Sequence, residues 1–161
     1  VRKGALELLE NIGRIESLRE LVLTTNGSQL EHMALPLKKA GVKRINISLD
    51  TLDADKFKAI TRTGDLAQVL RGVDAANAAG FERIKINSVI LKDKNHQEVV
   101  DLVQFAVDKG IDISFIEEMP LGAVSQHNRS AAYYSSDCIK ADLAEHYSLI
   151  ASTEKTGGPS V

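Results

Sequence analysis

The sequence predicts an α/β fold of parallel strands and helices, arranged as part of a TIM-like β/α barrel. Four short apolar runs end in polar residues and are separated by segments whose apolar residues recur at helical spacing, the pattern of repeated strand–helix units. Polar and apolar residues alternate in the middle runs, as in Asn46, Ile47 and Ser48. A strand with one polar face favours a barrel over a doubly wound sheet, whose strands are usually apolar on both faces.

The length of the chain limits how much of a barrel it can form. It has 161 residues, which is the size of one domain and room for about four strand–helix units. A complete eight-unit barrel takes about 250 residues. We therefore expect residues 1–161 to form a single domain that is an incomplete barrel.

The first half of the chain predicts three helices and two strands. Apolar residues at helical spacing place a helix at residues 5–15 and a second one ending at residue 40, before Gly41. Pro36 must lie in the first turn of that second helix or kink it. The strands are residues 20–24, which Asn26 and Gly27 end, and residues 44–49. Asp53 is the expected N-cap of a short helix at residues 54–61.

The second half continues the pattern. A helix at residues 66–79 ends at Gly80 and leads to a strand at residues 83–90. A charged loop then precedes a helix at residues 97–109, which ends at Gly110 before a strand at residues 112–117. Residues 121–134 predict a long loop, and such loops are often functional. Ser136 is expected to cap a last helix at residues 137–147, and residues 156–159 predict a turn.

Composition excludes several classes of function. The net charge is −2 and only 4% of residues are aromatic, which argues against a nucleic-acid partner. No apolar run reaches the roughly 18 residues of a membrane span. Cys138 is the only cysteine, so neither an internal disulfide nor a cysteine-bound metal is expected, and a reducing, cytoplasmic setting fits. The four histidines lie in separate segments without the spacing of metal ligands.

Polar residues near the ends of the strands predict one shared site. The ligands of parallel α/β sheets bind at the C-terminal ends of the strands, where this sequence has Thr24, Ser48, Lys85 and Met119. Lys85 is the sharpest candidate, because a lysine between two isoleucines in a strand is costly unless an anion or water meets it. Its charge suits phosphate oxygens. The alternative is an ion pair between Lys85 and an acidic residue across the sheet, either Glu117 or Asp50.

Each remaining candidate also has a purely structural explanation. Thr24 precedes an Asn-Gly turn, which could account for its residue type. Ser48 could hydrogen-bond the backbone of a neighbouring strand. Met119 and Cys138 could simply fill the core.

The ordered set of strand ends resembles one known family. It closely resembles the MoaA family, the radical S-adenosylmethionine GTP 3′,8-cyclases of molybdenum cofactor biosynthesis. The resemblance covers nearly the whole chain, and the four segments in order are far more specific than any one of them. The segments are LTTNG at residues 23–27, RINISLD at 44–50, KIN at 85–87 and FIEEM at 115–119.

The resemblance implies a fold, a reaction and a set of contacts. Members of the family have an incomplete six-unit β/α barrel, hold two [4Fe–4S] clusters, and use S-adenosylmethionine to start the conversion of GTP toward cyclic pyranopterin. Thr24 and Lys85 match GTP contacts, and Ser48 and Met119 match S-adenosylmethionine contacts. No residue of this chain matches a catalytic or metal-binding position.

The departures from the family pattern are equally informative. The cysteine motifs that bind both clusters are missing, so the resemblance implies that this chain is the central part of a MoaA-like enzyme and is inactive alone. Ser114 stands where many members have an arginine that faces phosphate. Unpaired edge strands favour self-association, and a homodimer is expected. The resemblance further implies a downstream MoaC-type partner enzyme.

Two other functions stay open at this point. One is a different radical S-adenosylmethionine enzyme that modifies peptides or haem precursors. The other is a non-catalytic α/β module that binds a phosphorylated metabolite.

Overall fold

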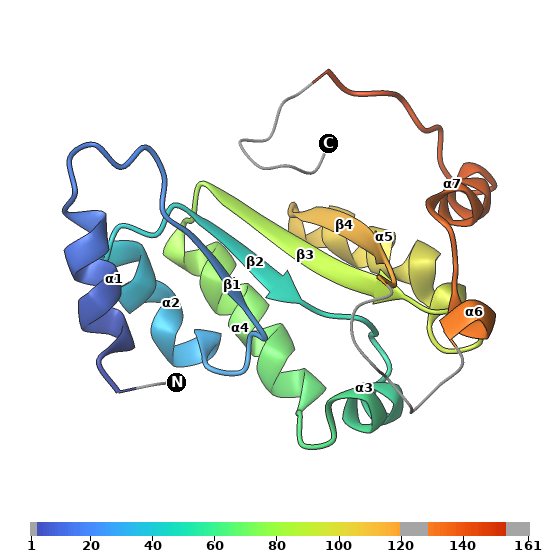
Figure 1. The fold of residues 1–161 in the computed structure, drawn as a ribbon, viewed down its shortest axis with the longest axis horizontal. Helices are drawn as coiled ribbons and strands as arrows, with labels where there is room; N and C mark the ends of the chain where they lie inside the picture. The colour runs from blue at the N-terminus through green and yellow to red at the C-terminus, as the bar shows by residue number, and fades with distance from the viewer. Residues whose placement is uncertain (1–2, 120–128, 154–161) are drawn as a thin grey trace.

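The protein contains one parallel sheet whose strands follow each other in chain order. A computed structural model describes residues 3–119 and 129–153. The order of the sheet is β1-β2-β3-β4, with every neighbouring pair parallel (Figure 1). A doubly wound sheet would reverse its strand order at a switch point, so the described part of the sheet has barrel topology, as the sequence predicts. The strands are β1 (Val22–Thr25), β2 (Arg44–Ser48), β3 (Arg83–Ile90) and β4 (Asp112–Glu117).

Helices connect the strands and cover one face of the sheet. In Figure 1, α4 and α5 lie behind the strands. In the described ranges, no helix is long and apolar enough to cross a lipid bilayer. The helical segments are α1 (Ala5–Gly13), α2 (Leu30–Lys39), α3 (Ala54–Thr61), α4 (Leu66–Ala79), the 3₁₀ turn η1 (His96–Glu98), α5 (Val99–Lys109), α6 (Arg129–Ala132) and α7 (Ser136–Ala144).

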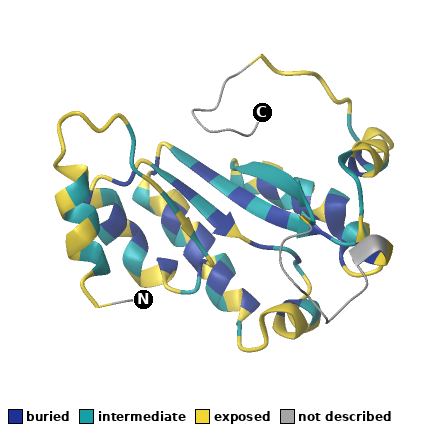
Figure 2. Ribbon diagram, in the orientation of Figure 1, coloured by how far each residue is buried: buried dark blue, intermediate teal, exposed yellow. Residues whose placement is uncertain are grey.

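The alternation of polar and apolar residues in the sequence matches the burial pattern of β2 and β3. Ile45, Ile47, Ile84 and Ile86 are at most 5% exposed and pack with apolar residues of α2 and α4. The residues between them are half-buried or exposed, which gives the alternating colours of β2 and β3 in Figure 2. The sheet therefore has one face that forms the core and one polar face that is less buried.

The first predicted helix ends early, and Pro36 lies deeper in the second helix than its first turn. The first ends at Gly13, not at residue 15, where it meets the C-terminal end of α2. A Cβ atom at Gly13 would lie only 2.1 Å from the carbonyl oxygen of Ala40, so this close approach requires glycine. Pro36 lies in the interior of α2 and not in its first turn.

The last helix begins one residue before its prediction and ends at Ala144, not at residue 147. The N-cap is Ser135, whose hydroxyl accepts a hydrogen bond from the Cys138 amide at 3.2 Å. Ile139 and Leu143 are the buried residues of α7. Cys138 is an exposed free thiol, so the prediction that it fills the core is wrong.

The long loop and the final turn are described only in part. Residues 129–132 form the short helix α6 inside the predicted loop, and Leu91 forms an antiparallel bridge with Tyr133. Residues 120–128 and the predicted turn at 156–159 lie outside the described residues.

Candidate functional site

The polar face of the sheet carries two cross-strand rows of polar residues. The register of the strands aligns Thr24 with Asn46, Asn46 with Lys85, and Lys85 with Asp112. Nearer the C-terminal ends of the strands, a second row aligns Ser48 with Asn87 and Asn87 with Ser114. Neighbouring strands lie about 4.8 Å apart, so Thr24 and Lys85 are about 10 Å apart across Asn46. The structure therefore places Thr24, Lys85 and Ser48 on one surface.

Lys85 is a half-buried cation on this face. Within the described residues its side chain has no hydrogen bond or ion pair. The arginines nearer the start of the strands differ, because each pairs with an acid: Arg44 lies 2.7 Å from Glu20, and Arg83 pairs with Asp112. Asp112 stands beside Lys85 in the register but binds Arg83, which leaves the ammonium group of Lys85 available to a ligand.

The acids proposed as alternative partners of Lys85 are both bound elsewhere. One carboxylate oxygen of Asp50 accepts a hydrogen bond from the Val89 amide at 2.8 Å, and burial raises the pKa of this carboxyl above its ordinary value. Glu117 accepts from the Ser136 amide at 2.6 Å and the Tyr133 hydroxyl at 2.7 Å. The Ser136 amide is the largest cause of the lowered pKa of Glu117. The ion pair considered from the sequence is therefore absent from the described part.

The hydroxyl of Thr24 is not used by the Asn-Gly turn. Thr25 and Asn26 form that turn by accepting hydrogen bonds from the amides of Gly27 and Ser28, each at 3.2 Å. Thr24 instead is exposed and accepts a long hydrogen bond from the amide group of Asn46, at 3.4 Å. Its side chain is therefore directed along the polar row.

Ser48 ends β2 with a hydroxyl that the sheet does not use. It is exposed, and in the part of the chain that the structure describes its side chain has no partner. The sequence alternative, a bond between the Ser48 hydroxyl and a neighbouring backbone, is therefore not formed there. Ser48 can donate to a ligand at the end of the strand.

Met119 does not fill the core and lies apart from the other candidates. Its side chain is 61% exposed, so the alternative of core filling is wrong. It is five residues beyond Ser114, which aligns with Ser48 through Asn87. Since β4 ends at Glu117, Met119 lies two residues past the end of the sheet. Within the described chain, the structure therefore brings Thr24, Lys85 and Ser48 together but leaves Met119 beyond them.

Sequence reasoning missed a buried polar network just beyond the second row. Glu98 is 8% exposed and accepts hydrogen bonds from the Thr51 hydroxyl at 2.6 Å and the Leu52 amide at 2.9 Å. Lys56 lies 2.7 Å from its other carboxylate oxygen. Burial alone would raise the pKa of Glu98, but Lys56, Thr51 and Leu52 offset it, and the pKa is lowered. We call Glu98, Thr51, Leu52 and Lys56 the Glu98 network.

Asn95 makes a second set of buried hydrogen bonds at the same place. Its side-chain amide donates to the carbonyl oxygens of Asp50 at 2.6 Å and Val89 at 2.9 Å, and its oxygen accepts from the Leu91 amide at 2.8 Å. Asn95 is 1% exposed. The charged composition of residues 92–96 predicts only a loop; the signal that could have pointed to Asn95 is its capacity to satisfy backbone groups where strands end.

The lowered pKa of Glu98 gives a testable dependence of stability on pH. A carboxylate whose pKa is lower in the folded chain stabilises the fold above its unfolded pKa, and this stabilisation is lost as the pH falls through the folded value. The ordinary value is 4.5. Glu98→Gln is therefore expected to lower the free energy of unfolding by about 2 kcal/mol near pH 7, with a smaller loss near pH 3.

Urea unfolding of both proteins at the two pH values measures this difference. The pKa values of Asp50 and Glu117 are also shifted, but both residues are present in the variant and in the wild type, so their contributions to the pH dependence cancel in the comparison. Glu82→Gln is the matched control, because Glu82 is 57% exposed and pairs with Lys43 only at 3.8 Å. A destabilisation by Glu98→Gln that stays constant from neutral to acidic pH would contradict the expectation.

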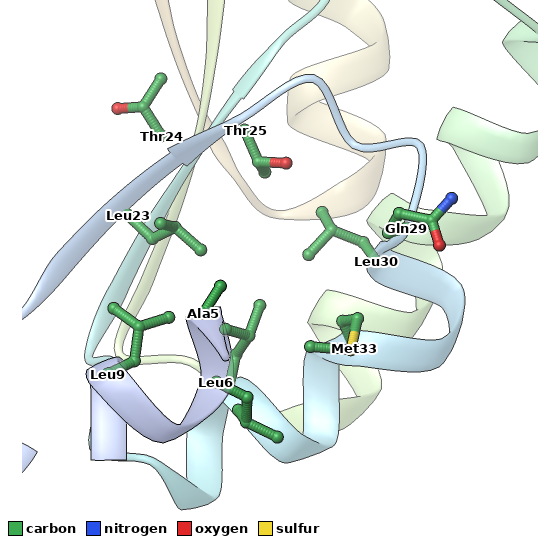
Figure 3. A pocket seen from close by; sticks show the side chains of 10 residues that line it. Ala5, Leu6, Leu9, Leu23, Thr24, Thr25, Gln29, Leu30 and Met33 are labelled. Atoms are coloured by element: carbon green, nitrogen blue, oxygen red, sulfur yellow. The ribbon is translucent and has the colours of Figure 1, made fainter. Parts of the chain in front are cut away.

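A separate cavity lies on the other side of β1 and is apolar. It has a volume of about 170 Å³ and lies between α1, β1 and α2, lined mainly by Leu6, Leu9, Leu23, Leu30 and Met33. In Figure 3 the Thr24 side chain projects from the opposite side of β1 to Thr25, away from these leucines. No charged residue lines the cavity, and Thr24 is the one residue of the polar rows that also borders it.

The chain does not contain the ligands of an iron–sulfur cluster. Its single cysteine cannot supply the several thiolates that a cluster requires. Among the residues that the structure describes, no group of three histidine, cysteine or acidic side chains could hold a metal ion.

One family model and several named proteins match this chain. The family model of the radical SAM superfamily matches residues 1–106. A GTP 3′,8-cyclase of Pseudomonas entomophila is 56% identical over 160 residues, which make up 99% of this chain and 48% of that protein. Proteins of the same name from Pseudomonas putida and Pseudomonas savastanoi pv. phaseolicola are 56% and 54% identical, with the same coverage.

The chain thus spans about half the length of the curated relatives it matches. The superfamily match covers more than half of the chain, and the matched region contains β1, β2 and β3 in barrel order. The chain belongs to the radical SAM superfamily.

Proposed function

We propose that this chain forms the central part of a GTP 3′,8-cyclase, which uses S-adenosylmethionine to convert GTP toward cyclic pyranopterin monophosphate in molybdenum cofactor biosynthesis. The observation that carries the proposal is the position of Lys85, a half-buried cation on the polar face without an acidic partner in the described chain. The name and the 56% identity of the relatives support it.

Lys85 and Thr24 are the proposed GTP contacts. A lysine ammonium is a compact charge with three donors, which suits the oxygens of a triphosphate. Thr24 and Asn46 add a hydroxyl and an amide in the same row. Ser114, in the second row, is neutral, so Lys85 carries the positive charge that these two rows offer to phosphate.

Ser48 and Met119 are the proposed S-adenosylmethionine contacts. The free hydroxyl of Ser48 at the end of β2 can donate to a polar group of the cofactor, and the exposed Met119 can reach it after the end of β4. When bound in a radical SAM enzyme, S-adenosylmethionine supplies the radical that begins the reaction on GTP. None of the described residues is proposed to be catalytic.

The two [4Fe–4S] clusters of the proposed enzyme need cysteines that residues 1–161 do not contain. We propose that these residues act as one barrel domain between the cluster-binding parts. The isolated chain is then inactive and binds GTP only weakly.

The proposed partners follow from the same function. GTP is the substrate, and an enzyme of the MoaC type would consume the product. The outer edges of β1 and β4 have no paired strand in the described part of the sheet, which favours a homodimer or pairing with further strands. The free thiol of Cys138 suits a cytoplasmic protein.

The deciding experiment compares the complete protein with residues 1–161 alone. The complete protein, with reconstituted clusters, S-adenosylmethionine and a reductant, is expected to consume GTP and release 5′-deoxyadenosine, and the isolated chain to do neither. Cleavage of S-adenosylmethionine with a peptide or haem precursor but not with GTP would replace the proposal by a different radical SAM activity. Micromolar GTP binding by the isolated chain, measured by calorimetry, would favour a phosphometabolite-binding module.

A further inference from the structure

We infer that Glu98 and Asn95 are positioning residues that hold the end of β2, with Ser48, in the geometry that the cofactor requires. This inference rests on the proposed function, because Ser48 is a cofactor contact only within it. Neither residue belongs to the polar rows, and neither is proposed to contact a ligand. Their role follows from their hydrogen-bond partners, which include residues just after the end of β2.

The backbone after Ser48 leaves the regular sheet. The register between β2 and β3 ends at the pair of Ser48 and Asn87, whereas β3 continues to Ile90 beside β4. Beyond that pair, the Leu49 amide still bonds the Asn87 carbonyl at 3.0 Å, and the Asp50 carboxylate replaces a backbone acceptor for Val89. Residues 50–53 therefore need other partners for their backbone groups.

Asn95 supplies the first of these partners. One side-chain amide joins the Asp50 carbonyl of the β2 end to the Val89 carbonyl of β3, at 2.6 and 2.9 Å. The same side chain accepts from the Leu91 amide, so its position is fixed from its own loop. Asn95 thus connects the ends of two neighbouring strands where their ladder has stopped.

The Glu98 network supplies the second set of hydrogen-bond partners for the segment after β2. Both carboxylate oxygens are used, one by Thr51 and Leu52 and the other by Lys56. Thr51 and Leu52 come from the connection between β2 and α3, and Lys56 comes from α3 itself. Glu98 is the last residue of η1, directly before α5. Hydrogen bonds to a charged, buried acceptor are strong, and breaking them leaves a buried charge without partners.

The cofactor side of the site, with Ser48, depends on Glu98 and Asn95 more than the nucleotide side does. Asn95 holds the carbonyl of Asp50, two residues after Ser48, and Glu98 holds Thr51, three residues after it. Displacement of either therefore moves the end of β2 that carries Ser48. Thr24 and Lys85 lie in the first row, inside the regular ladders of β1, β2 and β3. Loss of the Glu98 network is therefore expected to impair the cofactor side and to spare the nucleotide side.

The test uses the complete protein with Glu98→Ala, Glu98→Gln and the exposed control Glu82→Ala. Glu98→Ala is expected to raise the KM for S-adenosylmethionine about tenfold and to leave the KM for GTP within about twofold. Glu98→Gln keeps the shape and one acceptor, so it is expected to restore most of the affinity. Hydrogen exchange of the Leu52 amide, which donates to Glu98, is expected to accelerate in Glu98→Ala and to stay slow in Glu82→Ala.

The outcomes separate the inference from the proposed function. In a protein with cyclase activity, two results for Glu98→Ala would overturn the inference. One is a rise in the KM values for both ligands together. The other is faster exchange at Leu52 with both KM values unchanged. A wild-type protein that cleaves S-adenosylmethionine but leaves GTP intact would overturn the proposed cyclase activity. The affinity of the same variants for S-adenosylmethionine, measured by equilibrium dialysis, then still decides the positioning role. If Glu98→Ala does not fold, Glu98→Gln and Lys56→Met are compared instead.

Discussion

Replacing Lys85 with methionine is expected to weaken GTP binding roughly 10- to 100-fold, the effect of losing one charge-assisted contact to phosphate. Methionine keeps the unbranched chain and removes the charge. Because Lys85 has no ion pair in the described residues, no buried acid is left unpaired by the change. The fold should therefore keep its stability, and the loss should appear in GTP affinity alone.

Calorimetry with the complete protein measures the affinities for GTP and S-adenosylmethionine separately. Lys43→Met is the matched control, because Lys43 is 47% exposed and lies before β2, outside both polar rows. The control should bind both ligands like the wild type. Unchanged GTP affinity in Lys85→Met would refute the role proposed for this residue.

Replacing the next residue, Ile86, with alanine is expected to lower the stability of the fold, which Lys85→Met should leave unchanged. Ile86 is 0% exposed and belongs to the core cluster between the sheet and its helices. Deleting a buried isoleucine side chain to alanine removes its burial and leaves a cavity, which costs about 3 to 4 kcal/mol. The free energy of unfolding should fall by that amount, a large share of the total for a domain of this size.

Urea unfolding of the chain gives this difference from the midpoint and the slope. Val107→Ala is the control, because Val107 is 62% exposed on α5 and should change stability by less than about 0.5 kcal/mol. A loss below about 1 kcal/mol in Ile86→Ala would mean that the core does not pack on this face of β3.

Much of the fold could be predicted from local patterns. The strand at residues 83–90 and the helix at 66–79 have the predicted bounds, because period-2 alternation and a glycine stop are local signals. Asp53 caps α3 as expected, accepting from the Lys56 amide at 2.9 Å. The alternation also predicted that Lys85 lies on the polar face between two buried isoleucines, but it left open whether Lys85 pairs with an acid.

Other features depend on contacts that no local pattern reveals. Glu98 meets Thr51 and Leu52 across 47 and 46 residues of sequence, and only the parallel register of β2 and β3 brings them together. On α7 the buried residues are Ile139 and Leu143, and Cys138 lies about 100° around the helix from Ile139, on an exposed side. The ligand contacts proposed for Thr24, Lys85, Ser48 and Met119 stay predictions.

A sheet whose spatial order equals its chain order can form while the chain is still being synthesised. Each strand of this protein pairs first with the strand made just before it, so no strand has to wait for a distant partner. At every stage the newest strand is an open edge. If the sheet forms during synthesis, its open edge would move from β1 to β4, and a chaperone that shields edges would act on the strand made last.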